Sequence, residues 1–149
     1  PGIRNCEVTL ATDTDELRGD GAVISVVDKG NSVEFSLEAG GIGFDALAII
    51  LGKAPENTGT TPTQVGRIDY KSTDSRPYFF LTGQAKDDAG GDIQVVIWKA
   101  KITGNVVLGF ADESFLTPTM DGRGVGRSSD QLALSLIQHE TATDLAVPA

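Results

Sequence analysis

The sequence predicts a mainly β protein, an antiparallel β-sandwich or barrel with one short flanking α-helix. Residues 32–39 alternate strictly between apolar and polar side chains, which is the period of a half-buried antiparallel strand. Other short apolar runs lie between turn signals, a spacing typical of sandwiches and barrels. Only residues 44–51 show apolar side chains at helical spacing, so one short helix is expected.

The expected strands are short and follow one another along the chain. Their sequences are CEVTL, AVISVV, SVEFSLEA, VGRIDYK, PYFFLTGQAK, DIQVVIWKAKIT, NVVLGF and LALSLIQ. The turn signals between them are Asp20-Gly21, Gly30-Asn31, Ala89-Gly90-Gly91-Asp92 and Gly104-Asn105. In SVEFSLEA, the side chains expected to face the core are Val33, Phe35, Leu37 and Ala39.

The expected helix carries Phe44, Leu47, Ala48 and Leu51 on one face. Gly52 follows it and suits a left-handed C-cap, so the helix is predicted to end there. The polar segment PENTGTTPTQ comes next, and because it lacks core residues it is expected to be a surface loop.

The junction between strand 32–39 and this helix reads GGIGFDA, which fits the dinucleotide fingerprint G-x-G-x-x-G/A. That fingerprint requires a buried parallel strand before it and a helix long enough to cross the sheet after it. Here the strand is polar on one face and the helix spans about two turns. We interpret Gly40, Gly41 and Gly43 as a strand-to-helix elbow, and no cofactor is expected.

Residues Tyr78–Thr103 form the clearest predicted hairpin, with its tip at Asp87–Asp92. The tip carboxylates, Asp87, Asp88 and Asp92, are expected to oppose edge-to-edge pairing. The tip is read as a solvated turn, and a divalent ion held there in an assembly is the alternative.

Strict alternation along the second strand of this hairpin predicts two faces. One face carries Val96, Trp98, Ala100 and Ile102, and the other carries Ile93, Val95, Ile97, Lys99 and Lys101. Both faces are apolar in the first half, so this strand is predicted to contact its own core and a second surface such as another subunit. The predicted assembly residues are Asp87, Asp88, Asp92, Ile93, Val95, Ile97 and Trp98.

Composition narrows the classes of function. A chain of 149 residues is expected to form one domain, with the Gly-, Ser- and Thr-rich residues 122–149 as a carboxyl-terminal arm that takes part in assembly. The net charge of −9 disfavours gripping nucleic-acid phosphates, although it permits nucleic acid to pass close by. Cys6 is the only cysteine, so an intramolecular disulfide is excluded. No apolar run reaches the roughly 18–20 residues of a membrane helix, so no membrane insertion is expected.

Catalytic and metal-binding motifs are weak. The carboxylates of Asp13, Asp15 and Asp20 do not follow the order of a calcium loop, so an acidic surface turn is expected there. His139 is the only histidine and lies in a polar segment, and no serine sits in a G-x-S-x-G elbow. We therefore expect neither an enzyme nor a metal site.

Three stretches carry a resemblance to a known family. They are SVEFSLEAGGIGFDALAIILG, residues 73–124 and LIQHETAT. Together they cover just over half of the chain, and in the same order they resemble the major tail or tail tube proteins of long-tailed bacteriophages.

The resemblance implies a structural virion protein with a tail tube-like β fold. Its subunits would close into hexameric rings, and the stacked rings would form a tube that delivers double-stranded DNA. Its partners would be further copies of itself, the tape measure protein, the tail terminator and baseplate or initiator proteins. It would be assembled in the host cytoplasm and located in the virion tail, where its negative charge would let DNA slide.

Two other functions stay open. Another tail component, such as a terminator, would form rings without indefinite stacking. A small-ligand-binding β-barrel would be a monomer with a saturable pocket, and ligand would change the fluorescence of Trp98.

Overall fold

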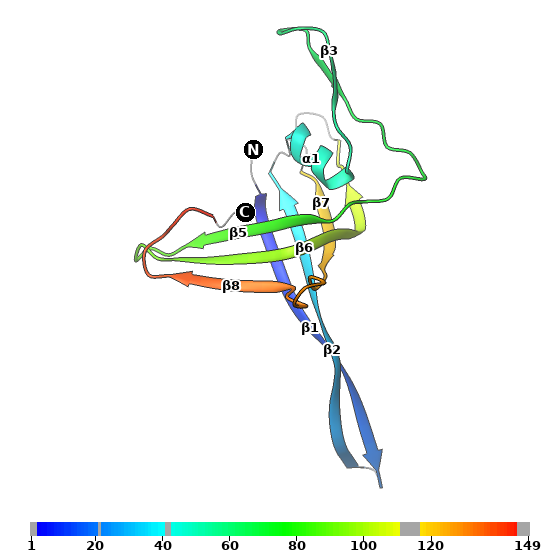
Figure 1. Cartoon of the computed structure of the whole chain (residues 1–149), viewed down its shortest axis with the longest axis vertical. Coiled ribbons are helices and arrows are strands. Elements are labelled where there is room, and N and C mark those ends of the chain that lie inside the picture. Colours follow the sequence, from blue (N-terminus) through cyan, green and yellow to red (C-terminus); the bar gives the residue numbers. More distant parts are fainter. Residues whose placement is uncertain (1–2, 21, 41–42, 111–116, 146–149) are drawn as a thin grey trace.

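The computed structural model (Figure 1) describes residues 3–20, 22–40, 43–110 and 117–145. This part of the chain is mainly β and antiparallel, with one short helix, which confirms the predicted fold class. Its elements are β1 Ile3–Gly19, β2 Ala22–Ala39, α1 Phe44–Leu51, β3 Glu56–Thr58, β4 Val65–Arg67, β5 Phe79–Lys86, β6 Asp92–Val107, β7 Thr119–Gly124 and β8 Leu134–His139.

The main sheet contains six strands and curls into a half-barrel. Its order is β1-β2-β7-β6-β5, and β8 pairs with β6. The long strand β6 pairs with β8 through Asp92–Ile97 and with β7 through Ala100–Val107. It also pairs with β5, so it contacts three other strands of the sheet. The outer strands β1 and β5 approach each other across a groove of about 460 Å³. Strands β3 and β4 form a separate small hairpin (Figure 1).

The core is formed by buried side chains of β2, β5, β6 and β7, together with Ile50 of α1. The alternation predicted for residues 32–39 is confirmed, since Val33, Phe35, Leu37 and Ala39 are all buried. The ring of Phe35 lies edge-to-face with Phe79 at 6.3 Å, which joins the middle of the sheet to β5.

The hairpin of β1 and β2 is much longer than predicted and projects beyond the rest of the molecule (Figure 1). Gly30-Asn31 was expected to be a turn, but β2 continues through it with a register shift between Asp13 and Thr14. Gly30 has a φ of 152°, which a glycine adopts without strain, so the bulge forms inside the strand. Asp13 and Asp15, predicted to lie in an acidic surface turn with Asp20, are instead part of β1, whereas Asp20 lies in the turn after it.

The two faces that strict alternation predicts for β6 do not continue along the whole strand in the structure. Leu81 pairs with Ile97 whereas Phe79 pairs with Ala100, so β6 carries one extra residue at this point. Such a bulge reverses the alternation, and Ile97, Ala100 and Ile102 therefore all belong to the same core cluster. The strand also runs through Gly104-Asn105, where a turn was predicted.

Helix α1 has the predicted bounds, and Gly52 ends it with the expected left-handed φ of 68°. Its buried residues are Ala48 and Ile50, whereas Phe44 was predicted to face the core and is exposed. The helix sequence FDALAIIL is almost wholly apolar, so apolar spacing does not single out one face. In the described ranges, no helix combines the length and apolar character needed to cross a membrane.

Two parts of the carboxyl-terminal region belong to the sheet, which corrects the boundary of the predicted arm. Gly122–Gly124 belong to β7, which lies between β2 and β6. Strand β8 then pairs with β6, and residues 140–145 pass close to the turn between β5 and β6.

Candidate assembly surfaces

The predicted tip of the β5–β6 hairpin is confirmed as a turn. The amide of Asp87 donates to the carbonyl of Gly91 at 2.9 Å, and the amide of Gly90 donates to the carbonyl of Asp87 at 3.0 Å. Asp87 and Asp88 are exposed on this turn. Of the residues predicted for assembly, Asp92 and Ile97 are buried inside the chain and therefore offer no surface to a neighbour.

An apolar patch remains exposed where β6 and β8 pair. Ile93 is 53% exposed, and Val95 is half-buried and pairs with Leu136, which is 66% exposed. We call Ile93, Val95 and Leu136 the β6–β8 patch. The sequence pointed to the two β6 residues, but Leu136 was missed because its position depends on the pairing of β8 with β6.

Trp98, on β6, is held by contacts from two other strands and a loop. Its indole Nε1 donates to Ser135 Oγ at 2.9 Å, and its ring lies 5.6 Å from Phe80 at an angle of 65°. The guanidinium of Arg127 lies 4.3 Å above the ring. These contacts make Trp98 an anchor within the chain, and its half-buried ring leaves only part of its surface for a neighbour.

Asp92 lies at the centre of a hydrogen-bonded network. His139 Nδ1 is 2.6 Å from Asp92 Oδ1, Gln94 Nε2 donates to Oδ2 at 2.9 Å, and Gln84 Nε2 donates to the same oxygen. The amide of Thr143 also points to Oδ2, at 3.4 Å. One buried carboxylate thus connects β5, β6, β8 and the segment after β8.

The donors around Asp92 favour its charged form. The hydrogen bond from Gln94, with those from Gln84 and His139, lowers the pKa of Asp92 to about 2 and outweighs the cost of burial. Both glutamine amides also reach the next segment, because Gln84 donates to the carbonyl of Thr143 at 2.7 Å and Gln94 to that of Asp144 at 3.2 Å. The network therefore fastens residues 142–145 to the hairpin.

The set Asp92, His139 and Thr143 contains the residue types of a nucleophile relay but not its geometry. In such a relay the carboxylate and the nucleophile contact different nitrogens of the imidazole. Here Thr143 Oγ1 lies 3.4 Å from Nδ1, the same nitrogen that contacts Asp92. The arrangement is that of a structural fastening.

The predicted glycine elbow lies at the end of β2. Gly40 forms a bend, Gly43 is the N-cap of α1 with φ −65° and ψ 148°, and Gly41 lies outside the described residues. Strand β2 has antiparallel neighbours on both sides, so this junction is not the βαβ unit that a dinucleotide fingerprint requires.

The outer half of the β1–β2 hairpin is exposed on both faces. We call residues 12–31 the distal hairpin; all of the side chains described there are exposed, including Leu17, Ile24 and Val27 at 59–66%. Exposed carboxylates lie among these apolar residues, namely Asp13, Asp15, Glu16, Asp20 and Asp28. The sequence did not indicate this surface because two expected turns concealed the length of the strands.

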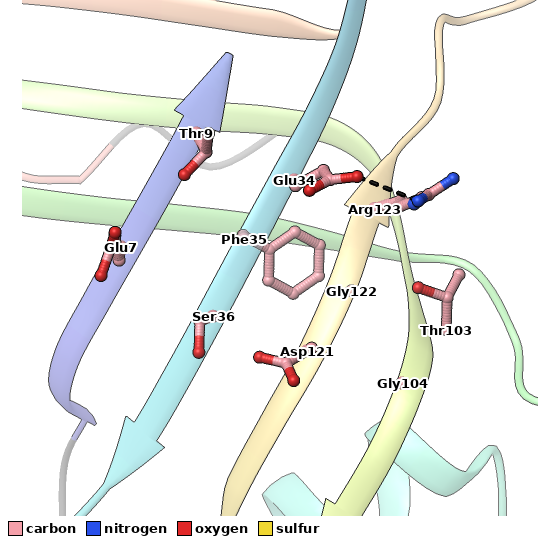
Figure 2. Close-up of a pocket in the computed structure, with 10 residues that line it drawn as sticks. All are labelled: Glu7, Thr9, Glu34, Phe35, Ser36, Thr103, Gly104, Asp121, Gly122 and Arg123. Atoms are coloured by element: carbon pink, nitrogen blue, oxygen red, sulfur yellow. Dashed lines mark ion pairs between the residues drawn. The ribbon is translucent and has the colours of Figure 1, made fainter. Parts of the chain in front are cut away.

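The outward face of the sheet is polar and hollowed. A depression of about 580 Å³ crosses β1, β2, β7 and β6 (Figure 2). Glu7, Glu34 and Asp121 border it, and Arg123 forms an ion pair with Glu34 at 3.0 Å. Within the described ranges, no group of three or more His, Cys, Asp or Glu side chains is placed to hold a metal ion.

Comparison of the chain with protein-family models gives no match, and comparison with curated proteins finds no similar sequence.

Proposed function

We propose that this chain is a structural virion protein that assembles into hexameric rings, stacked as the tail tube of a long-tailed bacteriophage. The observation that carries the proposal is the apolar surface that a single chain leaves uncovered on the distal hairpin and on the β6–β8 patch. Exposed apolar surface of this kind marks protein interfaces.

The distal hairpin has no covering layer of its own. An isolated two-stranded ribbon is marginally stable in water, because it lacks a third strand or a packed face. Residues 22–31 are all exposed, and four of them are large and apolar: Val23, Ile24, Val26 and Val27. Contact with other subunits would cover this ribbon and stabilise it.

The two apolar surfaces differ in shape and residues, and they lie on different parts of the molecule. The distal hairpin is a projecting ribbon of β1 and β2, and the β6–β8 patch lies on the body of the sheet (Figure 1). Contacts between unlike surfaces are heterologous, and they generate closed rings or open helical stacks. A tube of stacked rings contains both arrangements, because each ring is closed and the stack of rings is open.

The number of subunits and the passage of DNA rest on the resemblance of the sequence to tail tube proteins. The acidic border of the outward face is consistent with that role, because carboxylates repel phosphates and oppose sticking. In this proposal the partners are other copies of the chain, the tape measure protein, the tail terminator and the baseplate or initiator proteins, in the virion tail.

Negative-stain microscopy and sedimentation of the purified chain, with and without an initiator complex, test the proposal. We expect hexameric rings and tubes that grow with concentration. A chain that stays monomeric under both conditions would contradict it. Single rings that never stack would indicate a terminator instead.

A further inference from the structure

Two lysines share one aromatic ring on the outward face of the sheet. Lys99 Nζ lies 4.5 Å and Lys101 Nζ lies 5.1 Å from the centroid of Tyr78, whose residue is 51% exposed. Contact with the ring face favours each ammonium group, yet the arrangement also brings two like charges together. A bound anion would therefore stabilise this cluster by offsetting the repulsion between the two ammonium groups.

This positive charge has no counterion in the part of the chain that the structure describes. Neither lysine forms an ion pair there. Arg123 lies opposite Lys101 on the neighbouring strand β7, and its guanidinium forms an ion pair with Glu34. Arg76 lies nearby along the chain, and its guanidinium donates to the carbonyl of Gly104. We call Arg76, Tyr78, Lys99 and Lys101 the cationic patch.

The distal hairpin has the complementary charge. It carries five carboxylates and two cations, and both cations are already in ion pairs, Arg18 with Glu16 at 2.6 Å and Lys29 with Asp15 at 3.1 Å. Among the described residues, Asp13, Asp20 and Asp28 form no ion pair, because Arg18 pairs with Glu16 and Lys29 pairs with Asp15. The ribbon therefore has an excess of negative charge and exposed apolar side chains.

We propose that the distal hairpin of one copy docks on the cationic patch of the next copy. The two surfaces match in charge, and the aliphatic stems of the lysines and the ring of Tyr78 offer apolar area to Leu17 and the valines of the ribbon. The inference rests on the proposed self-assembly and names the two surfaces that make one of its contacts.

The contact is between chains. Within one chain the distal hairpin projects away from the part of the sheet that β5 and β6 form (Figure 1), so it does not reach its own patch. Because donor and acceptor surfaces are different, each bound copy presents a new free hairpin, and the contact propagates.

Double-stranded DNA is the competing anion, and the observations favour the hairpin. DNA binding relies on many phosphate contacts, whereas this patch has only three cations, Arg76, Lys99 and Lys101. The distal hairpin also offers exposed apolar side chains to the ring of Tyr78 and the lysine stems, which the phosphates of DNA do not.

Charge reversal and its repair test the contact. The first variant is Lys99→Glu/Lys101→Glu, the second is Asp13→Lys/Asp28→Lys, and the third combines them. Lys71→Glu/Lys86→Glu is the matched control, because it reverses two exposed lysines elsewhere. Circular dichroism confirms folding, and sedimentation velocity at low and high salt measures association. Fluorescence anisotropy measures binding of a labelled DNA duplex.

We expect each of the first two variants to weaken association about tenfold at low salt, and the combined variant to regain most of the loss. The control associates like the parent. The inference is overturned if the parent assembles and the lysine variant assembles equally well, although the tube proposal then stands. It is also overturned if the combination gives no repair, or if the lysine variant loses only DNA binding. A parent that never associates overturns both.

Discussion

At the scale of single residues, one buried carboxylate fastens the carboxyl-terminal segment to the β5–β6 hairpin. Asp92 accepts hydrogen bonds from Gln94, Gln84 and His139, and it is 2% exposed. Buried donors that lose their acceptor retain the cost of desolvation, so this position tolerates little change.

Asp92→Asn is expected to lower the melting temperature by several degrees. The substituted amide keeps the size of the side chain, but it replaces one acceptor oxygen by a donor that faces other donors. Thermal melting by circular dichroism measures the effect. Asp88→Asn, in the exposed turn, is the control and should melt like the parent. Equal melting of both variants would show that the network does not stabilise the fold.

The same carboxylate predicts an acid-dependent loss of stability. The pKa of Asp92 is lowered to about 2 from 3.8, so the folded state binds a proton less readily than the unfolded state. The stabilisation is therefore complete above about pH 4 and is lost as the pH falls through 2. Ion pairs of Asp74 and Asp130 act in the same direction, so the useful quantity is the difference between parent and Asp92→Asn. Urea unfolding at several pH values should show that difference shrinking below pH 4.

Gly122 is a second position where a single added carbon atom is expected to destabilise the fold. A Cβ there would lie 2.6 Å from the carbonyl oxygen of Lys101 and would also overlap the ring of Phe35. Gly122→Ala is expected to cost about 1–3 kcal/mol in the free energy of unfolding, measured with urea. Gly43→Ala is the control, because nothing lies within 4 Å of its Cβ position and its φ is −65°. The reverse order of stability would refute this account.

At the scale of elements, the glycine-containing turn motifs predicted two turns correctly and two turns wrongly. The turns at Asp87–Asp92 and at Asp20 are present. At Gly30 and Gly104 the same kind of signal lies inside long strands, at points of irregular register. Local sequence reports that a backbone can bend, whereas the partner strand decides whether it bulges or turns.

Alternation predicted burial accurately in β2 but not in β6, for a related reason. Residues 33–38 pair regularly on both sides, so period two persists and the core face is correct. In β6 the extra residue between Ile97 and Ala100 changes the face, and no local pattern marks it. The Asp92 network was missed because Gln84 and His139 approach it only through strand pairing.

Trp98 joins β5, β6 and β8, so its removal should loosen three elements together. Trp98→Ala loses the contact with Phe80 and the hydrogen bond to Ser135, and we expect a cost of about 3 kcal/mol in the free energy of unfolding. Trp98→Phe keeps an aromatic ring but loses the hydrogen bond and part of the ring contact, so we expect a smaller cost, about 1–2 kcal/mol. Urea titrations of both variants measure the costs. Unfolding of Trp98→Ala at the parent's urea concentration would refute the anchoring role.

At the scale of the whole molecule, the core and the proposed assembly surface of the distal hairpin use different parts of the chain. The core lies where β2, β5, β6 and β7 meet, and it includes none of the residues of the distal hairpin. The ribbon therefore adds nothing to the core of a single chain. In an isolated monomer its exposed apolar side chains would carry a risk of aggregation, so contact with other molecules is the role that accounts for them.

Replacing residues 13–30 by Asn-Gly should therefore separate folding from assembly. The pair Thr12 and Asn31, already opposite each other, would flank a two-residue turn of the type that hairpins favour. We expect the shortened chain to melt close to the parent, because the side chains described in the deleted segment are exposed, and to sediment as a monomer. Since it keeps the body of the sheet but has no hairpin to donate, small amounts added to the parent should shorten the assemblies seen by microscopy. Assembly of the shortened chain alone, to the same size as the parent, would show that the distal hairpin makes no necessary contact.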